Sequence, residues 1–172
     1  VEVALDEGYV SDAEARVFNT DSRALPASEA AERVAVLTEQ VLRQHAPDWL
    51  VKKIDSTLRG NPGAEVAAMQ QVAGAAVVII APAFPAAGRV TRNGKCFVNG
   101  VLLTETEFAS DPKTPITHAD VGALFIGRSV NVQPGDLPQI LATATTDAPV
   151  MVIVDAQTDA DLDAIVSHAM QA

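Results

Sequence analysis

The sequence of 172 residues contains little cysteine, few aromatic residues and few basic residues. Its single cysteine, Cys96, excludes an internal disulfide and is consistent with a reducing, cytoplasmic location. Only 4% of the residues are aromatic, so the core has to be built from Ala, Val, Leu and Ile. With 12 Lys and Arg against 22 Asp and Glu, the formal net charge is -10, which argues against binding to nucleic acid or to an anionic membrane.

Long apolar runs and nucleotide-binding motifs are also missing. The longest apolar stretch, VAGAAVVIIAPAFPAAG, contains two prolines and is too short to predict a membrane span. Neither G-x-x-x-x-G-K-[ST] nor G-x-G-x-x-G occurs, so no motif marks a nucleotide site. The histidines His45, His118 and His168 lack the spacing of metal ligands, and we expect no metal site in this chain.

Short β-branched runs alternate with helical patterns along the chain. The runs VEVAL (1–5), ARVFN (15–19), WLVKKI (49–54), AVVIIA (76–81) and VMVIV (150–154) predict strands. The spacing of apolar residues predicts helices over 26–45, 62–72 and 158–170. This alternation predicts one α/β domain over 1–172, with a mostly parallel sheet flanked by helices on both faces. The turn dipeptides Asn93-Gly94 and Asn99-Gly100 predict a small β-hairpin insertion.

Polar residues gather where three of the predicted strands end. The segments are TDSR (20–23), DSTLRGN (55–61) and PAFPAAGR (82–89), and each carries an arginine. Because ligands of open parallel sheets bind beyond the carboxyl ends of the strands, we expect the three segments to meet at one rim. The second segment and its flanks, from Lys52 to Gly63, also carry an excess of positive charge.

Such a rim suits a small polyhydroxylated anion, because carboxylates and phosphates bind Arg, Lys, hydroxyls and helix N-terminal amides. A carboxylate such as Asp55 can orient a sugar hydroxyl or accept its proton. Each residue also has a structural alternative. These alternatives are a turn or cap for Asp21 and Ser22, protection of an edge strand for Lys52 and Lys53, and a helix cap for Asn61.

Several segments resemble the four-carbon acid sugar kinase family, whose members phosphorylate threonate, erythronate, 3-oxo-tetronate and related acids with ATP. The segments are NTDSR (19–23), KKIDSTLRGNPGAEV (52–66), APAFPAAGRVTRNGKCFVNGVLLTETEFASDPKTP (81–115) and VDAQTDADLDAI (154–165), in the family's order. The resemblance implies that the chain is most of an N-terminal domain that binds the acid sugar. The family's C-terminal domain, absent here, binds ATP and Mg²⁺, and catalysis takes place in the cleft between the two.

The resemblance also implies which residues form the site. It points to substrate-binding residues in all three loops: Asp21, Ser22, Arg23, Lys53, Ser56, Arg59, Gly60, Phe84, Pro85, Gly88 and Arg89. We expect Arg59 and Lys53 to pair with the substrate carboxylate and Asp55 to accept a hydrogen bond from a sugar hydroxyl. Arg23 or Arg89 is expected to support the anion or the arriving phosphoryl group. Asp55 is also the candidate catalytic base.

This sequence departs from the family pattern in two ways. It lacks the opening acidic turn of the D-D-x-T-G type, which is the competing source of the catalytic base. It also lacks the glycine-rich nucleotide-binding half, so the chain alone is not expected to act as a kinase.

Several readings stay open at this point. The chain is alternatively a stand-alone acid-sugar-binding module without turnover, or an α/β domain whose rim residues serve only folding and assembly. The segment TETEFASDPKTP (104–115) either borders the site through Glu105, Thr106 and Asp111 or forms a surface loop. The oligomeric state, a homo-oligomer included, is also open.

Overall fold

A parallel sheet forms the middle layer of the fold. The computed structural model describes residues 2–4 and 13–172. The strands β3 (Val77–Ile80), β8 (Val150–Val154) and β7 (Ser129–Val132) pair in the order β3-β8-β7, and both pairings are parallel. The predicted α/β class with a mostly parallel sheet is confirmed. Strand β7 was not predicted from the sequence.

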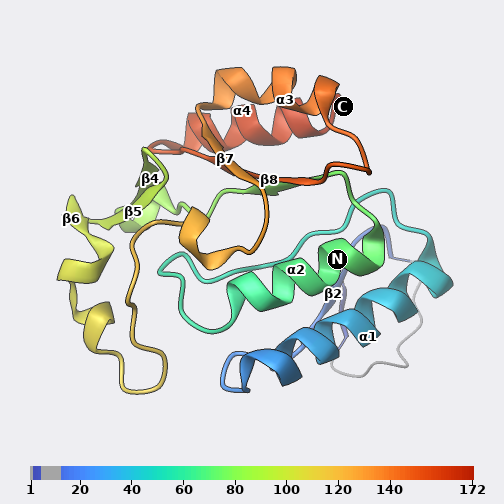
Figure 1. The fold of residues 1–172 in the computed structure, drawn as a ribbon, viewed down its shortest axis with the longest axis horizontal. Helices are drawn as coiled ribbons and strands as arrows, with labels where there is room; N and C mark the ends of the chain where they lie inside the picture. The colour runs from blue at the N-terminus through green and yellow to red at the C-terminus, as the bar shows by residue number, and fades with distance from the viewer. Residues whose placement is uncertain (1, 5–12) are drawn as a thin grey trace.

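Helices cover both faces of this sheet, as predicted (Figure 1). The helices α3 (Leu137–Thr143) and α4 (Asp159–Ala169) lie on one face. The helices α1 (Ala27–His45) and α2 (Pro62–Ala73) lie on the other, where α1 packs against α2. The three helices predicted from the sequence are confirmed to within three residues at each end, whereas α3 was missed.

The two faces of β8 supply two separate hydrophobic cores, because successive side chains of a strand point to opposite faces. Val150, Val152 and Val154 pack under α3 and α4. Met151 and Ile153 pack in the cluster on the α2 side. All five residues of β8 are buried, which explains why its sequence is a continuous apolar run.

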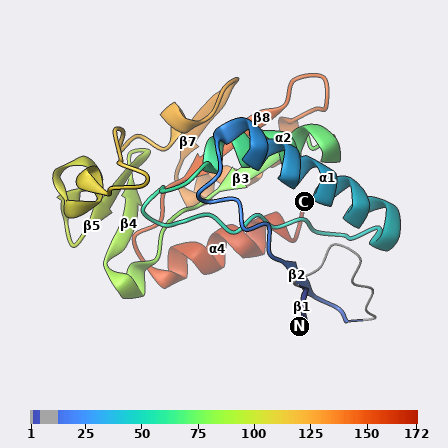
Figure 2. The same cartoon turned by 90° about the horizontal axis from the view of Figure 1, so that it is seen from below.

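A second, two-stranded parallel sheet is formed by β1 (Glu2–Ala4) and β2 (Arg16–Phe18) (Figure 2). The strand predicted over residues 49–54 is wrong. These residues form an unpaired connection between α1 and α2. Trp49 is 53% exposed and Val51 is 84% exposed, so neither contributes the buried face that would hold a strand in a sheet.

The predicted hairpin insertion is confirmed and is larger than expected. The strands β4 (Arg89–Arg92), β5 (Lys95–Val98) and β6 (Val101–Leu102) form an antiparallel meander. Both Asn-Gly turns have positive φ at their two central residues, as tight hairpin turns require. Short 3₁₀ helices complete the fold: η1 (Pro85–Ala87), η2 (Leu103–Glu105), η3 (Glu107–Ser110), η4 (Gly122–Leu124) and η5 (Pro134–Asp136).

A search for membrane-spanning helices found none of sufficient length and apolar character in the described ranges 2–4 and 13–172.

Candidate functional site

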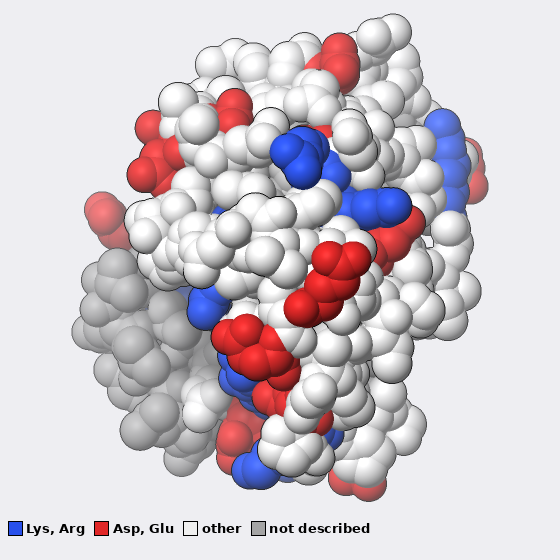
Figure 3. All heavy atoms as spheres, turned by 90° about the vertical axis from the view of Figure 1, so that its left-hand side faces the viewer, with Lys and Arg blue, Asp and Glu red and all other residues white. Residues whose placement is uncertain are grey.

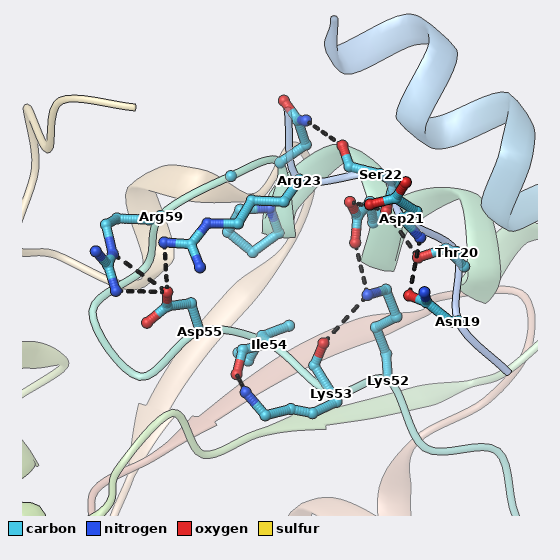
Figure 4. A pocket seen from close by; sticks show the side chains of 14 residues that line it. Asn19, Thr20, Asp21, Ser22, Arg23, Lys52, Lys53, Ile54, Asp55 and Arg59 are labelled. Atoms are coloured by element: carbon cyan, nitrogen blue, oxygen red, sulfur yellow. Dashed lines mark hydrogen bonds and ion pairs between the residues drawn. The ribbon is translucent and has the colours of Figure 1, made fainter. Parts of the chain in front are cut away.

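The first two predicted loops enclose a cavity of about 250 Å³ (Figure 4). One wall is the segment that follows β2, and the other runs from the 52–55 segment into the N-terminus of α2. The lining residues are Asn19, Thr20, Asp21, Ser22, Arg23, Lys52, Lys53, Ile54, Asp55, Arg59, Gly60, Asn61, Pro62 and Glu65. Seven of the predicted site residues therefore share one cavity: Asp21, Ser22, Arg23, Lys53, Asp55, Arg59 and Gly60.

Asp55 is the centre of the charged groups in this cavity. Its Oδ2 atom lies 3.1 Å from Nη2 of Arg23 and 3.1 Å from Nη2 of Arg59. Figure 4 shows the two guanidinium groups converging on this carboxylate. The Asp55 side chain is 16% exposed and that of Arg59 is 22% exposed, whereas that of Arg23 is 55% exposed. Arg59 is thus held inside the site, and Arg23 keeps donors open to solvent.

Thr57 fixes the other side of the Asp55 carboxylate. Its backbone N–H and its hydroxyl both donate to Asp55 Oδ1, at 2.9 and 2.8 Å, and the hydroxyl accepts from Arg59 Nε at 2.9 Å. Burial raises the pKa of Asp55, but the Thr57 hydrogen bonds and the charges of Arg59 and Arg23 outweigh it and leave the pKa below its ordinary value. Asp55 is therefore held in the ionised form, ready to accept hydrogen bonds.

A buried polar chain ties the first loop to α2 at the back of the cavity. Ser22 Oγ donates to Glu65 Oε1 at 2.7 Å, and Lys52 Nζ lies 2.6 Å from Glu65 Oε2. Asn61 stands at the N-cap position of α2, but its side chain does not cap the helix. It donates instead to the carbonyl oxygens of Ser22 and Leu25, at 3.2 and 2.9 Å. Asn61 therefore occupies the predicted cap position, but the expectation that its side chain caps the helix is wrong. Its side chain joins the two loops instead.

The backbone of both loops adopts conformations that are unfavourable for most side chains. Asp21 has φ of 43° and the buried Leu58 has φ of 59°. Gly60 has φ of 91°, and a Cβ atom there would lie 3.2 Å from Cγ of Arg23. Strained backbone of this kind concentrates at ligand sites, where the surrounding structure has to enforce it. Gly60 therefore allows Arg23 to pack closely over the loop.

The third predicted loop lies beside the cavity rather than in its wall, since none of its residues belongs to the lining. Arg89 nevertheless reaches the second loop, where its Nη1 atom donates to Ser56 Oγ at 3.0 Å. Phe84 exchanges two backbone hydrogen bonds with Arg89, and its own side chain is 51% exposed. Gly88 has φ of 67°, and a Cβ atom there would lie 2.0 Å from Oδ1 of Asn99. Phe84 and Gly88 thus shape the turn that presents Arg89.

Residues 104–115 border this group, and sequence reasoning named only part of the contact. Asp111 Oδ2 lies 3.4 Å from Arg59 Nη1. Phe108, which was not predicted, lies beneath two guanidinium groups, with its ring centre 4.9 Å from Cζ of Arg59 and 5.9 Å from Cζ of Arg89. The signal that would have revealed it is a single aromatic residue in the otherwise polar run TETEFASDPKTP. Within the described part of the chain, neither Glu105 nor Thr106 makes a side-chain hydrogen bond or ion pair with a residue of the site.

Much of the positive charge expected from the sequence is paired with carboxylates. Arg23, Arg59 and Lys52 all make ion pairs. Figure 3 accordingly shows acidic and basic side chains interspersed on one face, not one basic patch. Within residues 13–172, Lys53 and Arg89 have no carboxylate partner, and Lys53 Nζ donates only to the carbonyl of Ile54, at 3.1 Å. These two cations contribute unpaired positive charge next to the cavity, as does Arg33, whose Nη1 atom donates to the carbonyl oxygens of Thr20 and Asp21.

The described residues offer no arrangement suited to a metal ion, because no group of three or more His, Cys, Asp or Glu side chains comes together among them. The carboxylates of the cavity are bound to arginine and lysine instead. Mg²⁺ therefore has no evident binding group in the described part of this chain.

Comparison with known proteins assigns this chain to a family. A family model described as the sugar-binding N-terminal domain matches residues 2–172. A D-threonate kinase of Salmonella typhimurium is 42% identical over 169 residues, which cover 92% of this chain and 40% of that protein. A D-erythronate kinase of Heliobacterium modesticaldum is 38% identical over 166 residues, covering 88% of this chain and 37% of that protein. The chain thus spans about two fifths of the length of these curated relatives.

A solved structure shows the same fold. It is a Bordetella bronchiseptica protein described as a domain of unknown function, crystallised with bound citrate as a domain-swapped dimer. It matches with a TM-score of 0.78 and 35% sequence identity, covering 90% of this chain and 38% of that one.

Proposed function

Because the chain belongs to the family of sugar-binding N-terminal domains, we propose that it binds the acid-sugar substrate of a four-carbon acid sugar kinase. The observation that carries the proposal is the convergence of Arg23 and Arg59 on Asp55 inside a cavity of about 250 Å³. The relatives named for D-threonate and D-erythronate support a substrate that combines one carboxylate with several hydroxyls.

We assign different side chains of the cavity to the carboxylate and to the hydroxyls of such a substrate. Arg23, whose side chain is 55% exposed, and Lys53 have donors available for the substrate carboxylate. Asp55 is ionised and accepts hydrogen bonds, which suits a sugar hydroxyl. Arg59 uses its own donors on Asp55, Thr57 and Asp111, so it orients Asp55 more than it contacts the ligand. This differs from the sequence-based expectation, which gave Arg59 the substrate carboxylate.

The low pKa of Asp55 bears on its proposed second role as catalytic base. A carboxylate stabilised by two guanidinium groups is a weak base, because Brønsted behaviour favours a pKa near the working pH. Phosphoryl transfer depends chiefly on positioning and on stabilisation of charge. We therefore assign Asp55 the positioning of the reacting hydroxyl.

In the whole kinase, ATP and Mg²⁺ would be bound by a partner domain that this chain does not contain. Its own side chains would supply the position of the acid sugar, and Arg89 would stand at the edge where the phosphoryl group arrives. We place this reaction in the cytoplasm, where Cys96 stays a thiol. A homo-oligomer is compatible with the domain-swapped dimer of the Bordetella protein.

The proposal is tested by thermal unfolding of the chain with D-threonate, D-erythronate, erythritol and ATP. A ligand at about 100 times its dissociation constant adds about 2.7 kcal/mol to stability. We expect a higher melting temperature with one of the acids and no shift with erythritol, which lacks the carboxylate, or with ATP. Equal shifts with erythritol and the acids, or no shift with any acid, would contradict the proposal.

The matched variants are Arg23→Ala and Arg92→Ala. Losing a hydrogen bond to a charged group costs about 1.5–3 kcal/mol, so Arg23→Ala should weaken acid binding about 10- to 100-fold. Arg92 lies on β4 and stacks on Phe97, away from the residues that line the cavity, so Arg92→Ala should bind the acid as the wild type does. A stand-alone binding module would give the same result, and kinase activity of the full-length protein with ATP separates the two.

A further inference from the structure

We infer that Phe108 is a positioning residue that holds Arg59 and Arg89 behind the acid-sugar site. The inference rests on the proposed function, because it concerns the same site. It adds a residue that lies outside the cavity wall and touches neither of the groups assigned to the substrate carboxylate.

The ring of Phe108 faces both guanidinium groups. Its centre lies 4.9 Å from Cζ of Arg59 and 5.9 Å from Cζ of Arg89, within the range of cation–π attraction. Arg59 comes from the second loop and Arg89 begins β4, so one ring links two segments that are far apart in sequence. The two like charges therefore contact the same aromatic ring, and within the described residues they share no carboxylate.

Phe108 is itself anchored, which is what a positioning residue requires. Its side chain packs against the buried cluster that contains Leu58 and Ile116. Its carbonyl oxygen accepts from the backbone N–H groups of Asp111 and Ile116, each at 3.2 Å. The ring therefore cannot move without disturbing the core beneath the second loop.

Each arginine in turn donates hydrogen bonds to the second loop. Arg59 donates to Asp55 and Thr57, and Arg89 donates to Ser56. The side chains of three consecutive residues of that loop are therefore each held by one of the two arginines. Arg89 depends strongly on the ring, because its buried Nε atom has no hydrogen-bond partner within the described part of the chain. Without Phe108 both long side chains would regain rotamer freedom. Binding of the acid would then have to order them again, which would lower the affinity.

The test combines ligand affinity with a spectroscopic signature that needs no ligand. Phe108→Leu and Phe108→Met both remove the ring and keep an apolar side chain in the core. Titration calorimetry with D-threonate or D-erythronate, whichever the wild type binds, should show affinity weakened about fivefold. In proton–nitrogen NMR spectra, the Nε–H signals of Arg59 and Arg89 should move downfield, because protons above an aromatic face are shielded. Phe108→Tyr should restore both properties.

Phe97 provides a matched control. Its ring carries the same kind of contact, with Cζ of Arg92 at 4.5 Å from its centre, but Arg92 is not part of the site. Phe97→Leu should leave acid binding and the two Nε–H signals unchanged. Equal losses in Phe97→Leu and Phe108→Leu, or unchanged arginine signals in both Phe108 variants, would overturn the inference. If the wild type bound neither acid, the proposed function would fail, while the arginine signals would still decide the role of Phe108.

Discussion

Asp55 shows how one side chain can organise a binding site. It receives two ion pairs on Oδ2 and two hydrogen bonds from Thr57 on Oδ1, although it is only 16% exposed. A carboxylate withdrawn from water in this way is stable only when nearby donors and positive charges offset the loss of hydration. The sequence predicted the position of Asp55 in a loop with two nearby cations, but it could not show that Thr57 completes the arrangement. Serine and threonine in a loop have too many alternative partners for their spacing to decide.

The first prediction concerns Thr57→Val, which removes the hydroxyl but keeps the shape of the side chain. Thr57 is fully buried, and its hydroxyl serves Asp55 and Arg59, so the loss should destabilise the chain by about 1–3 kcal/mol. The pKa of Asp55 should rise toward its ordinary value of 3.8. Urea unfolding and carboxylate NMR titration measure the two effects.

The pH dependence of this variant has a definite sign. In the wild type the folded pKa of Asp55 lies below 3.8, so its ionisation stabilises the fold above that pH, and the benefit is lost as the pH falls through the folded pKa. In Thr57→Val the folded pKa lies closer to 3.8, so the ionisation of Asp55 contributes less stability, and the difference in stability between the wild type and the variant should narrow as the pH falls below 3.8. Thr143→Val, which removes a hydroxyl at an exposed position of helix α3, should leave the pKa of Asp55 unchanged. An unaltered Asp55 titration in Thr57→Val would contradict the assigned role of the hydroxyl.

The secondary-structure elements follow the sequence where burial and periodicity agree. The continuous apolar run of β8 is buried on both faces, and α4 begins with a capping box between Thr158 and Asp161. Strand β7 was missed because its sequence SVNV is short and only half apolar, with alternate residues exposed. Helix α3 is seven residues long, too short for a helical period to stand out. The run WLVKKI has strand-like residue types but no partner strand, and pairing is a tertiary property.

Asp155, at the end of β8, joins the hairpin to the sheet. It is 2% exposed and accepts from the backbone N–H groups of Asn93 and Gly94 and from the side chains of Asn131 and Gln133. The sequence placed it in a family segment without assigning a role. Through it the Asn93-Gly94 turn between β4 and β5 is held against the central sheet.

The second prediction is that Asp155→Asn destabilises the chain by about 3 kcal/mol, because an amide NH₂ would face N–H donors in a buried site. Chemical denaturation measures the change. Asp163→Asn, at an exposed position of α4, is the control and should change stability by less than about 0.5 kcal/mol. Equal stability of Asp155→Asn and the wild type would show that the hairpin is held by other contacts.

At the scale of the whole molecule, the proposed site has to bind an anion although the chain carries a net charge of -10. The cations of the cavity are mostly matched by nearby carboxylates, and on the face drawn in Figure 3 basic and acidic side chains are interspersed. Selectivity would then come from hydrogen-bond geometry at short range, since salt at physiological strength screens exposed charges beyond about 8 Å. The sequence predicted that the three loops meet. Their ion-pair partners and the ring of Phe108 required coordinates, because the partners come from distant segments.

The most direct test of this account is a backbone NMR titration of the chain with D-threonate and D-erythronate. We predict that one of these acids shifts the amide signals of residues 20–23 and 53–60, which border the cavity. The signals of α4 (Asp159–Ala169), on the opposite face of the central sheet, should stay in place. Shifts confined to α4 or to other surfaces, with the signals of both cavity loops unchanged under saturating acid, would contradict the account.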